Sequence, residues 1–87
     1  MKNNQILGAL ALDLKRVAIG YFRGSNTMAE KFYEEALKRK KELDGKSLKP
    51  YLINFLNRLD DLKEQEKSKA AEDALLYSTI FQNAAVS

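Results

Sequence analysis

The sequence predicts an all-α protein, folded as a small up-down four-helix bundle. Its 87 residues fit one domain, residues 1–87. The composition is that of a globular protein, with 45% hydrophobic and 31% charged residues. One proline and four glycines leave few places for turns, which favours long helices.

The first predicted helix spans residues 4–23. At 100° per residue, its apolar positions cover roughly two thirds of the circumference, wider than one core face needs. The polar positions share one narrow arc: Gln5, Asp13, Arg16, Gly20 and Arg23. Asn3 or Asn4 is expected to cap the start of this helix, and Gly24 to close its end.

The outer flank of this wide apolar sector is a candidate protein interface. It contains Leu12, Ile19 and Phe22, with Lys15 as the one charged residue inside the sector. The long stem of Lys15 can cover apolar surface while its ammonium reaches water. A compact bundle leaves open what covers this flank.

The second predicted helix spans residues 28–43. Thr27 and Glu30 have the spacing of a capping box, and the apolar positions of the helix share one face. Asp44-Gly45 predicts its end.

The remaining residues form helices 48–64 and 68–85 in the preferred interpretation. Pro50 is tolerated in a first turn, and Ser68 can cap the last helix. Residues 63–69 are polar but rich in helix formers, so the alternative is three helices with 48–85 as one long helix, about 57 Å at 1.5 Å per residue. Four helices are preferred because they bury every apolar face within one chain.

Nothing in the sequence indicates catalysis, a cofactor or a metal site, and we expect a protein that is not an enzyme. Cysteine and histidine are absent, which removes thiol chemistry, the commonest general base and the commonest transition-metal ligand. Asp13 and Asp73 lie closest to buried faces, and we expect each to be a paired carboxylate or one at the rim of the core rather than a catalytic group; Asp13 can pair with Arg16, one turn on.

Residues 6–22 predict neither a membrane span nor an export signal. The apolar run is too short and is interrupted by Asp13, Lys15 and Arg16. A cytoplasmic location is therefore expected.

A basic cluster in residues 38–49 is the second candidate site. Its candidate polyanion contacts are Lys38, Arg39, Lys41, Lys46 and Lys49. Glu42 and Asp44 are interleaved and Lys40 falls near the apolar face, so a solvated helix end is the simpler interpretation.

These observations lead to two functional expectations. The first is a non-enzymatic protein–protein interaction module that self-associates as a homodimer, or docks on another protein, through the first helix. The alternative is a nucleic-acid-binding accessory protein that uses residues 38–49.

Overall fold

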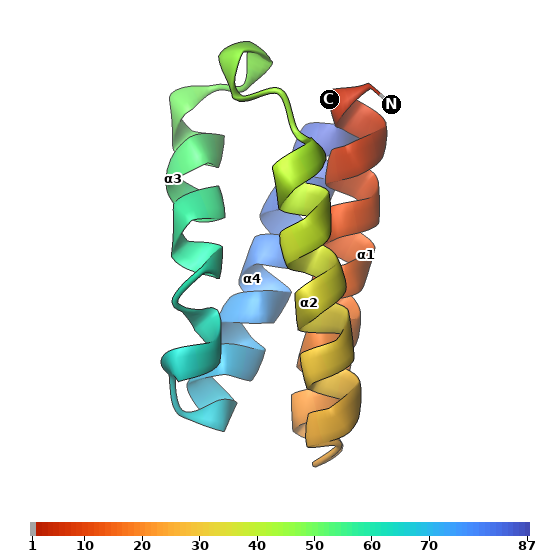
Figure 1. The fold of residues 1–87 in the computed structure, drawn as a ribbon, viewed down its shortest axis with the longest axis vertical. Coiled ribbons are helices and arrows are strands. Elements are labelled where there is room, and N and C mark those ends of the chain that lie inside the picture. The colour runs from red at the N-terminus through yellow and green to blue at the C-terminus, as the bar shows by residue number, and fades with distance from the viewer. Residues whose placement is uncertain (1) are drawn as a thin grey trace.

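The computed structural model describes residues 2–87 and contains four α-helices in this range. They are α1 (Asn3–Phe22), α2 (Asn26–Glu42), α3 (Pro50–Leu59) and α4 (Lys67–Val86). The helices run alternately down and up a bundle that measures 36 × 20 × 20 Å (Figure 1). The predicted up-down four-helix bundle is confirmed.

The alternative with one long helix over residues 48–85 is wrong, because the chain reverses between α3 and α4. The third helix ends at Leu59, earlier than the predicted residue 64, and a short 3₁₀ turn, η2 (Leu62–Glu64), follows. Leu59 and Leu62 are both buried, at 0% and 1% exposure. The reversal thus keeps both leucines in the core, which outweighs the helix propensity of the polar residues that follow.

The helix caps differ from those expected. Ser25, rather than Thr27, is the N-cap of α2, and its hydroxyl accepts a hydrogen bond from the Met28 amide at 3.3 Å. Glu66 precedes α4, and the Ser68 hydroxyl donates to the Glu66 carboxylate instead of capping the helix. Neither cap could be chosen from spacing alone, because several neighbouring residues have suitable side chains.

Gly24 closes α1, as the sequence predicts. Its φ of 75° is the left-handed conformation that glycine adopts without steric cost. The Gly24 amide donates to the Tyr21 carbonyl, and the Ser25 amide donates to the Gly20 carbonyl at 2.8 Å. This is the Schellman pattern, and it turns the chain sharply into α2.

At the opposite end of the bundle, the start of α1 is tied to the connection after α2. Asn3 caps no helix, and neither does Asn4, because the residue before α1 is Lys2 and makes no side-chain cap. Instead, the Asn3 side chain donates to the Asp44 carbonyl and accepts from the Asp44 amide, both at 3.0 Å. A second 3₁₀ turn, η1 (Gly45–Ser47), then leads to α3.

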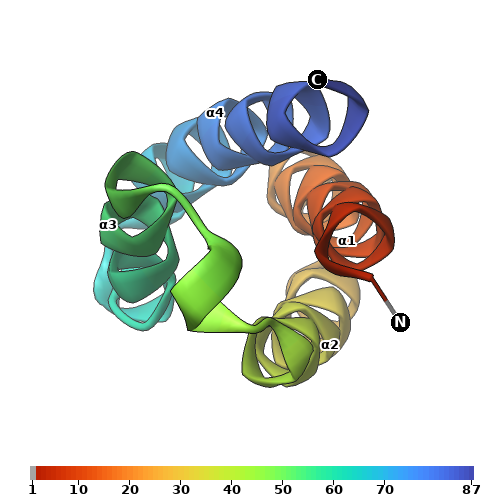
Figure 2. The same ribbon diagram turned by 90° about the horizontal axis from the view of Figure 1, so that it is seen from above.

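The helix α1 lies between α2 and α4 and packs closely on both, whereas α3 lies diagonally across from it (Figure 2). Small residues permit the close approach: a Cβ on Gly20 would lie 2.7 Å from the Ala29 amide nitrogen of α2. Alanines of α2 and α4 are buried in the same core. The helix α3 contributes larger side chains to that core, Leu52, Leu56 and Leu59.

Candidate protein-interaction surface

A shallow groove of about 340 Å³ runs along the outer surface between α1 and α4. It is lined by Ala11, Leu12 and Lys15 of α1 and by Leu75, Ser78, Thr79, Gln82 and Asn83 of α4. The buried Ser78 hydroxyl donates to the Ala11 carbonyl at 2.7 Å. This bond fixes the register of the two antiparallel helices beneath the groove.

The structure leaves the predicted α1 flank largely uncovered. Leu12 is 47% exposed and Phe22 61% exposed, while Ile19 is half-buried and Lys15 is exposed. Leu12 and Lys15 line the groove, and Ile19 and Phe22 follow them along α1 towards its end. The four residues share one stripe, since they are spaced three and four residues apart.

The helix α4 supplies exposed leucines to this surface that were not predicted. Leu75 is 44% exposed and lines the groove beside Leu12, and Leu76 next to it is 51% exposed. The signal in the sequence was the pair Leu75-Leu76, because the two residues point in directions about 100° apart and one inner face cannot bury both. We call the exposed surface formed by the groove, Leu76 and the α1 flank the α1–α4 face.

The α1–α4 face is poor in charge. Residues 3–12 and 74–87 contain no charged side chain, although 31% of the whole chain is charged. Because α1 and α4 are antiparallel neighbours, these two uncharged segments lie side by side (Figure 1). Lys15 is the one charged residue that lines the groove.

Asp13 lies on the other side of α1, where it faces α2. It is buried, and its Oδ2 is 3.7 Å from Nε of Arg39, too long for a hydrogen bond. Burial raises the pKa of Asp13, and the charge of Arg39 offsets part of this effect. The expected partner, Arg16, instead lies 5.2 Å from the centre of the Phe32 ring. Asp13 is therefore part of the α1–α2 contact.

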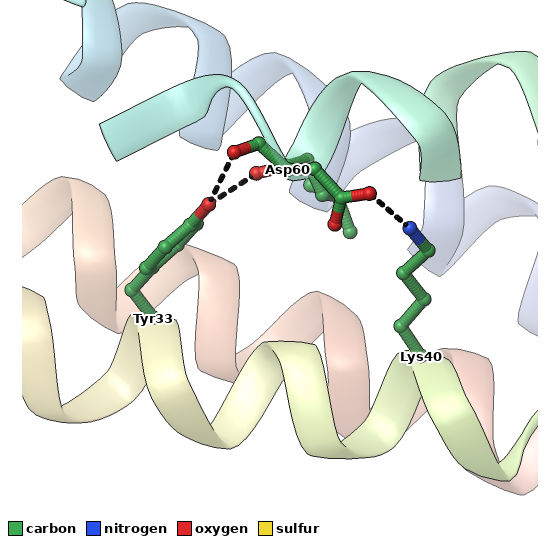
Figure 3. Close-up of polar contacts among 4 residues, drawn as sticks. Tyr33, Lys40 and Asp60 are labelled. Carbon is green, nitrogen blue, oxygen red and sulfur yellow. Dashed lines mark hydrogen bonds and ion pairs between the residues drawn. The ribbon is translucent and has the colours of Figure 1, made fainter. Parts of the chain in front are cut away.

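Three of the six cations in residues 38–49 form ion pairs within the bundle. Lys38 lies 3.5 Å from Glu35, and Arg39 lies 3.6 Å from Glu42 in addition to its contact with Asp13. Lys40 reaches across to Asp60 at 2.9 Å (Figure 3). Lys41, Lys46 and Lys49 are exposed and make no ion pair within residues 2–87.

The acidic side chains do not converge on a metal-binding arrangement. Asp73 is buried and pairs with Lys69 at 3.0 Å, which agrees with the expected paired carboxylate. Within residues 2–87, no group of three acidic side chains is arranged to hold a metal ion. The same residues include no helix with the length and apolar character needed to cross a membrane.

Comparison of the chain with protein-family models, with curated proteins and with solved structures found no match.

Proposed function

We propose that the protein is a non-enzymatic protein–protein interaction module and that the α1–α4 face is its contact surface. The observation that carries this proposal is the coincidence of exposed leucines with a groove in the most charge-poor part of the molecule. The cores of protein interfaces are depleted in charged residues, and exposed apolar patches mark interaction sites.

Leu12 of α1 and Leu75 of α4 lie on opposite walls of the groove and can contribute binding energy. Each is close to half exposed, so a partner that covers them removes apolar area from water. Full burial of a leucine side chain contributes about 1.5–3 kcal/mol, and half of that from each residue supports a weak to moderate association. The groove gives these contacts a defined shape.

Binding of nucleic acid through residues 38–49 has less support. Lys38, Arg39 and Lys40 are engaged with acidic groups of the bundle, which leaves Lys41, Lys46 and Lys49 for phosphates. A chain that used them would be retained on a polyanion column at low salt, and retention would fall steeply as salt is raised.

Site-specific crosslinking in cells that express the chain tests the proposal. A photoreactive amino acid at position 75 is expected to give a discrete adduct with a protein. Leu12→Glu in the same chain is expected to abolish it, because a carboxylate on the facing wall of the groove would have to be desolvated. The photoreactive residue placed at Glu34, which is exposed on α2, is the matched control.

The adduct is expected from position 75 and not from position 34. The absence of an adduct from position 75, or an adduct that Leu12→Glu leaves unchanged, overturns the proposal. The melting temperature of the Leu12→Glu variant verifies that the bundle remains folded, as expected for a half-exposed position.

A further inference from the structure

We infer that the protein bound at the α1–α4 face is a second copy of this chain, related to the first by a two-fold axis parallel to the helices. In this arrangement α1 of each copy lies on the partner's α4. The inference rests on the proposed function, whose contact surface it shares. Three features of the surface carry it: its lack of charge, the chemistry of its polar groups, and the positions of Lys15 and Glu72.

The lack of charge suits a symmetric interface, in which the same surface of each copy contacts the other. A two-fold interface sets the same patch on both subunits, so a charged residue near the axis lies close to its own copy and is repelled. Residues 3–12 and 74–87 place no charged side chain there. A strongly charged partner, by contrast, would find no counterions in this region.

The polar groups of the groove can also pair with their own copies. Thr79, Gln82 and Asn83 line it, and hydroxyl and amide side chains both donate and accept hydrogen bonds. Two identical surfaces therefore satisfy each other without a second type of surface.

The direction of the axis follows from Lys15 and Glu72, the first exposed charged residues after residue 12 on α1 and before residue 74 on α4. The Ser78–Ala11 hydrogen bond sets these two residues at one level of the bundle. From that level, Lys15 is about 6 Å further along α1, and Glu72 is about 9 Å away along α4 in the same direction. Glu72 is exposed and points within about 20° of Thr79, seven residues later, which lines the groove.

A two-fold axis parallel to the helices leaves the height of each residue along the bundle unchanged. It sets α1 of one copy opposite α4 of the other. It therefore places Lys15 opposite the partner's Glu72, and Leu12 opposite the partner's Leu75. An axis perpendicular to the helices would set α1 on the partner's α1. Lys15 would then lie opposite either the partner's Lys15 or the partner's uncharged residues 3–12. Only the parallel axis gives both charges a counterion.

Sedimentation equilibrium of the purified chain with exchanged charges tests this arrangement. The wild-type chain is expected to dimerise. Lys15→Glu and Glu72→Lys are each expected to raise the dimer dissociation constant about tenfold, because each creates a like-charge pair twice in the dimer. The double variant Lys15→Glu/Glu72→Lys is expected to restore it to within about twofold of wild type. Glu34→Lys on α2 is the matched control and leaves it unchanged.

The outcomes separate this inference from the proposed function. A wild-type chain that stays monomeric at about 500 µM overturns the inference that the partner is a second copy, because a dimer with a Kd of about 1–10 µM would be almost fully formed at that concentration. If position 75 still crosslinks to a different protein, the proposed function survives that result. A dimer that resists Leu12→Glu overturns the α1–α4 face as the dimer contact, and the crosslink from position 75 then decides the proposed function by itself. A dimer that Leu12→Glu dissociates but that the double charge exchange does not restore overturns the parallel axis.

Discussion

The hydroxyl of Tyr33 on α2 donates a buried hydrogen bond to the backbone carbonyl of Leu59, the last residue of α3 (Figure 3). The same hydroxyl lies 3.2 Å from the Asp60 carbonyl. These carbonyls belong to the end of a helix, where no intrahelical amide is available to them. Burial raises the pKa of Tyr33, so the hydroxyl stays protonated and remains a donor. One side chain of α2 thus satisfies the backbone carbonyls at the end of α3.

Tyr33→Phe is expected to lower the free energy of unfolding by about 1–3 kcal/mol, because it leaves a buried carbonyl without its donor. Chemical denaturation measures this loss. Tyr51→Phe is the control, since Tyr51 is 46% exposed and its hydroxyl forms no hydrogen bond within residues 2–87. Equal stability of the two variants would contradict the role given to Tyr33.

Glycine-to-alanine substitutions in α1 are expected to have opposite effects at two positions. At Gly20 the new Cβ would lie 2.7 Å from the Ala29 backbone nitrogen, and backbone cannot move aside cheaply. We expect a loss of about 1–3 kcal/mol from this overpacking. At Gly8 the nearest atom is the Ala85 Cβ at 3.9 Å, an ordinary contact. Gly8→Ala is therefore expected to raise stability by up to about 1 kcal/mol through helix propensity.

Thermal unfolding of the two variants measures this difference. A Gly20→Ala variant as stable as Gly8→Ala would mean that α1 and α2 do not approach as closely as the structure places them.

Asp13 is expected to make stability depend on pH in a direction unusual for a carboxylate. Its pKa is raised in the folded chain, so the folded state holds the proton more tightly than the unfolded state. The stabilisation from this group is complete below the unfolded pKa, near 3.8, and is lost as pH rises through the higher folded pKa. Other carboxylates contribute in parallel, so a difference measurement is needed.

Asp13→Asn removes this titration. The free energy of unfolding of wild type minus that of the variant is expected to fall as the pH is raised from the unfolded pKa of 3.8 through the higher folded pKa. Urea denaturation of both proteins across this range gives the difference. A difference that rises with pH would indicate that attraction by Arg39 and Arg16 dominates over burial at this site.

Ser78→Ala is expected to lower the free energy of unfolding by about 1 kcal/mol, because it removes the buried hydrogen bond to Ala11. Ser68→Ala is the control, since Ser68 is exposed and bonds only to the adjacent Glu66 carboxylate. Denaturation curves of both variants provide the comparison. An unchanged Ser78→Ala variant would show that the register of α1 and α4 is set by apolar packing alone.

The sequence predicted the four helices because their apolar periodicity and the turn residues Gly24 and Gly45 are local signals. It misplaced the end of α3, because the contacts made there are tertiary: Leu59 and Leu62 are both buried in the core, and the Leu59 carbonyl accepts from Tyr33, a residue distant in the sequence. It also chose Thr27 over Ser25 as a cap. Both have a suitable hydroxyl, and the Schellman turn at Gly24 decides between them.

The sequence pointed to the α1 part of the candidate surface and missed the α4 part. The excess width of the apolar sector of α1 singled out Leu12 and Phe22 but left open what covers them, and the structure leaves both exposed. The contribution of Leu75 and Leu76 was missed, because periodicity within one helix does not tell which other helix lies beside it. The same limit explains Arg39, which the sequence presents as a surface cation and the fold places against buried Asp13.

The diagonal position of α3 has a consequence for how the bundle opens. The helices α2 and α4 both pack closely on α1, and α3 is joined to these three helices by leucine side chains, Tyr33 and the Lys40–Asp60 pair. Detaching α3 leaves the Gly20–Ala29 and Ser78–Ala11 contacts intact. The backbone amides of α3 should therefore exchange with deuterium through a partial opening that costs less free energy than global unfolding. The proposed contact surface, the α1–α4 face, lies on two helices that stay packed together in this opening, so release of α3 would leave that surface unchanged.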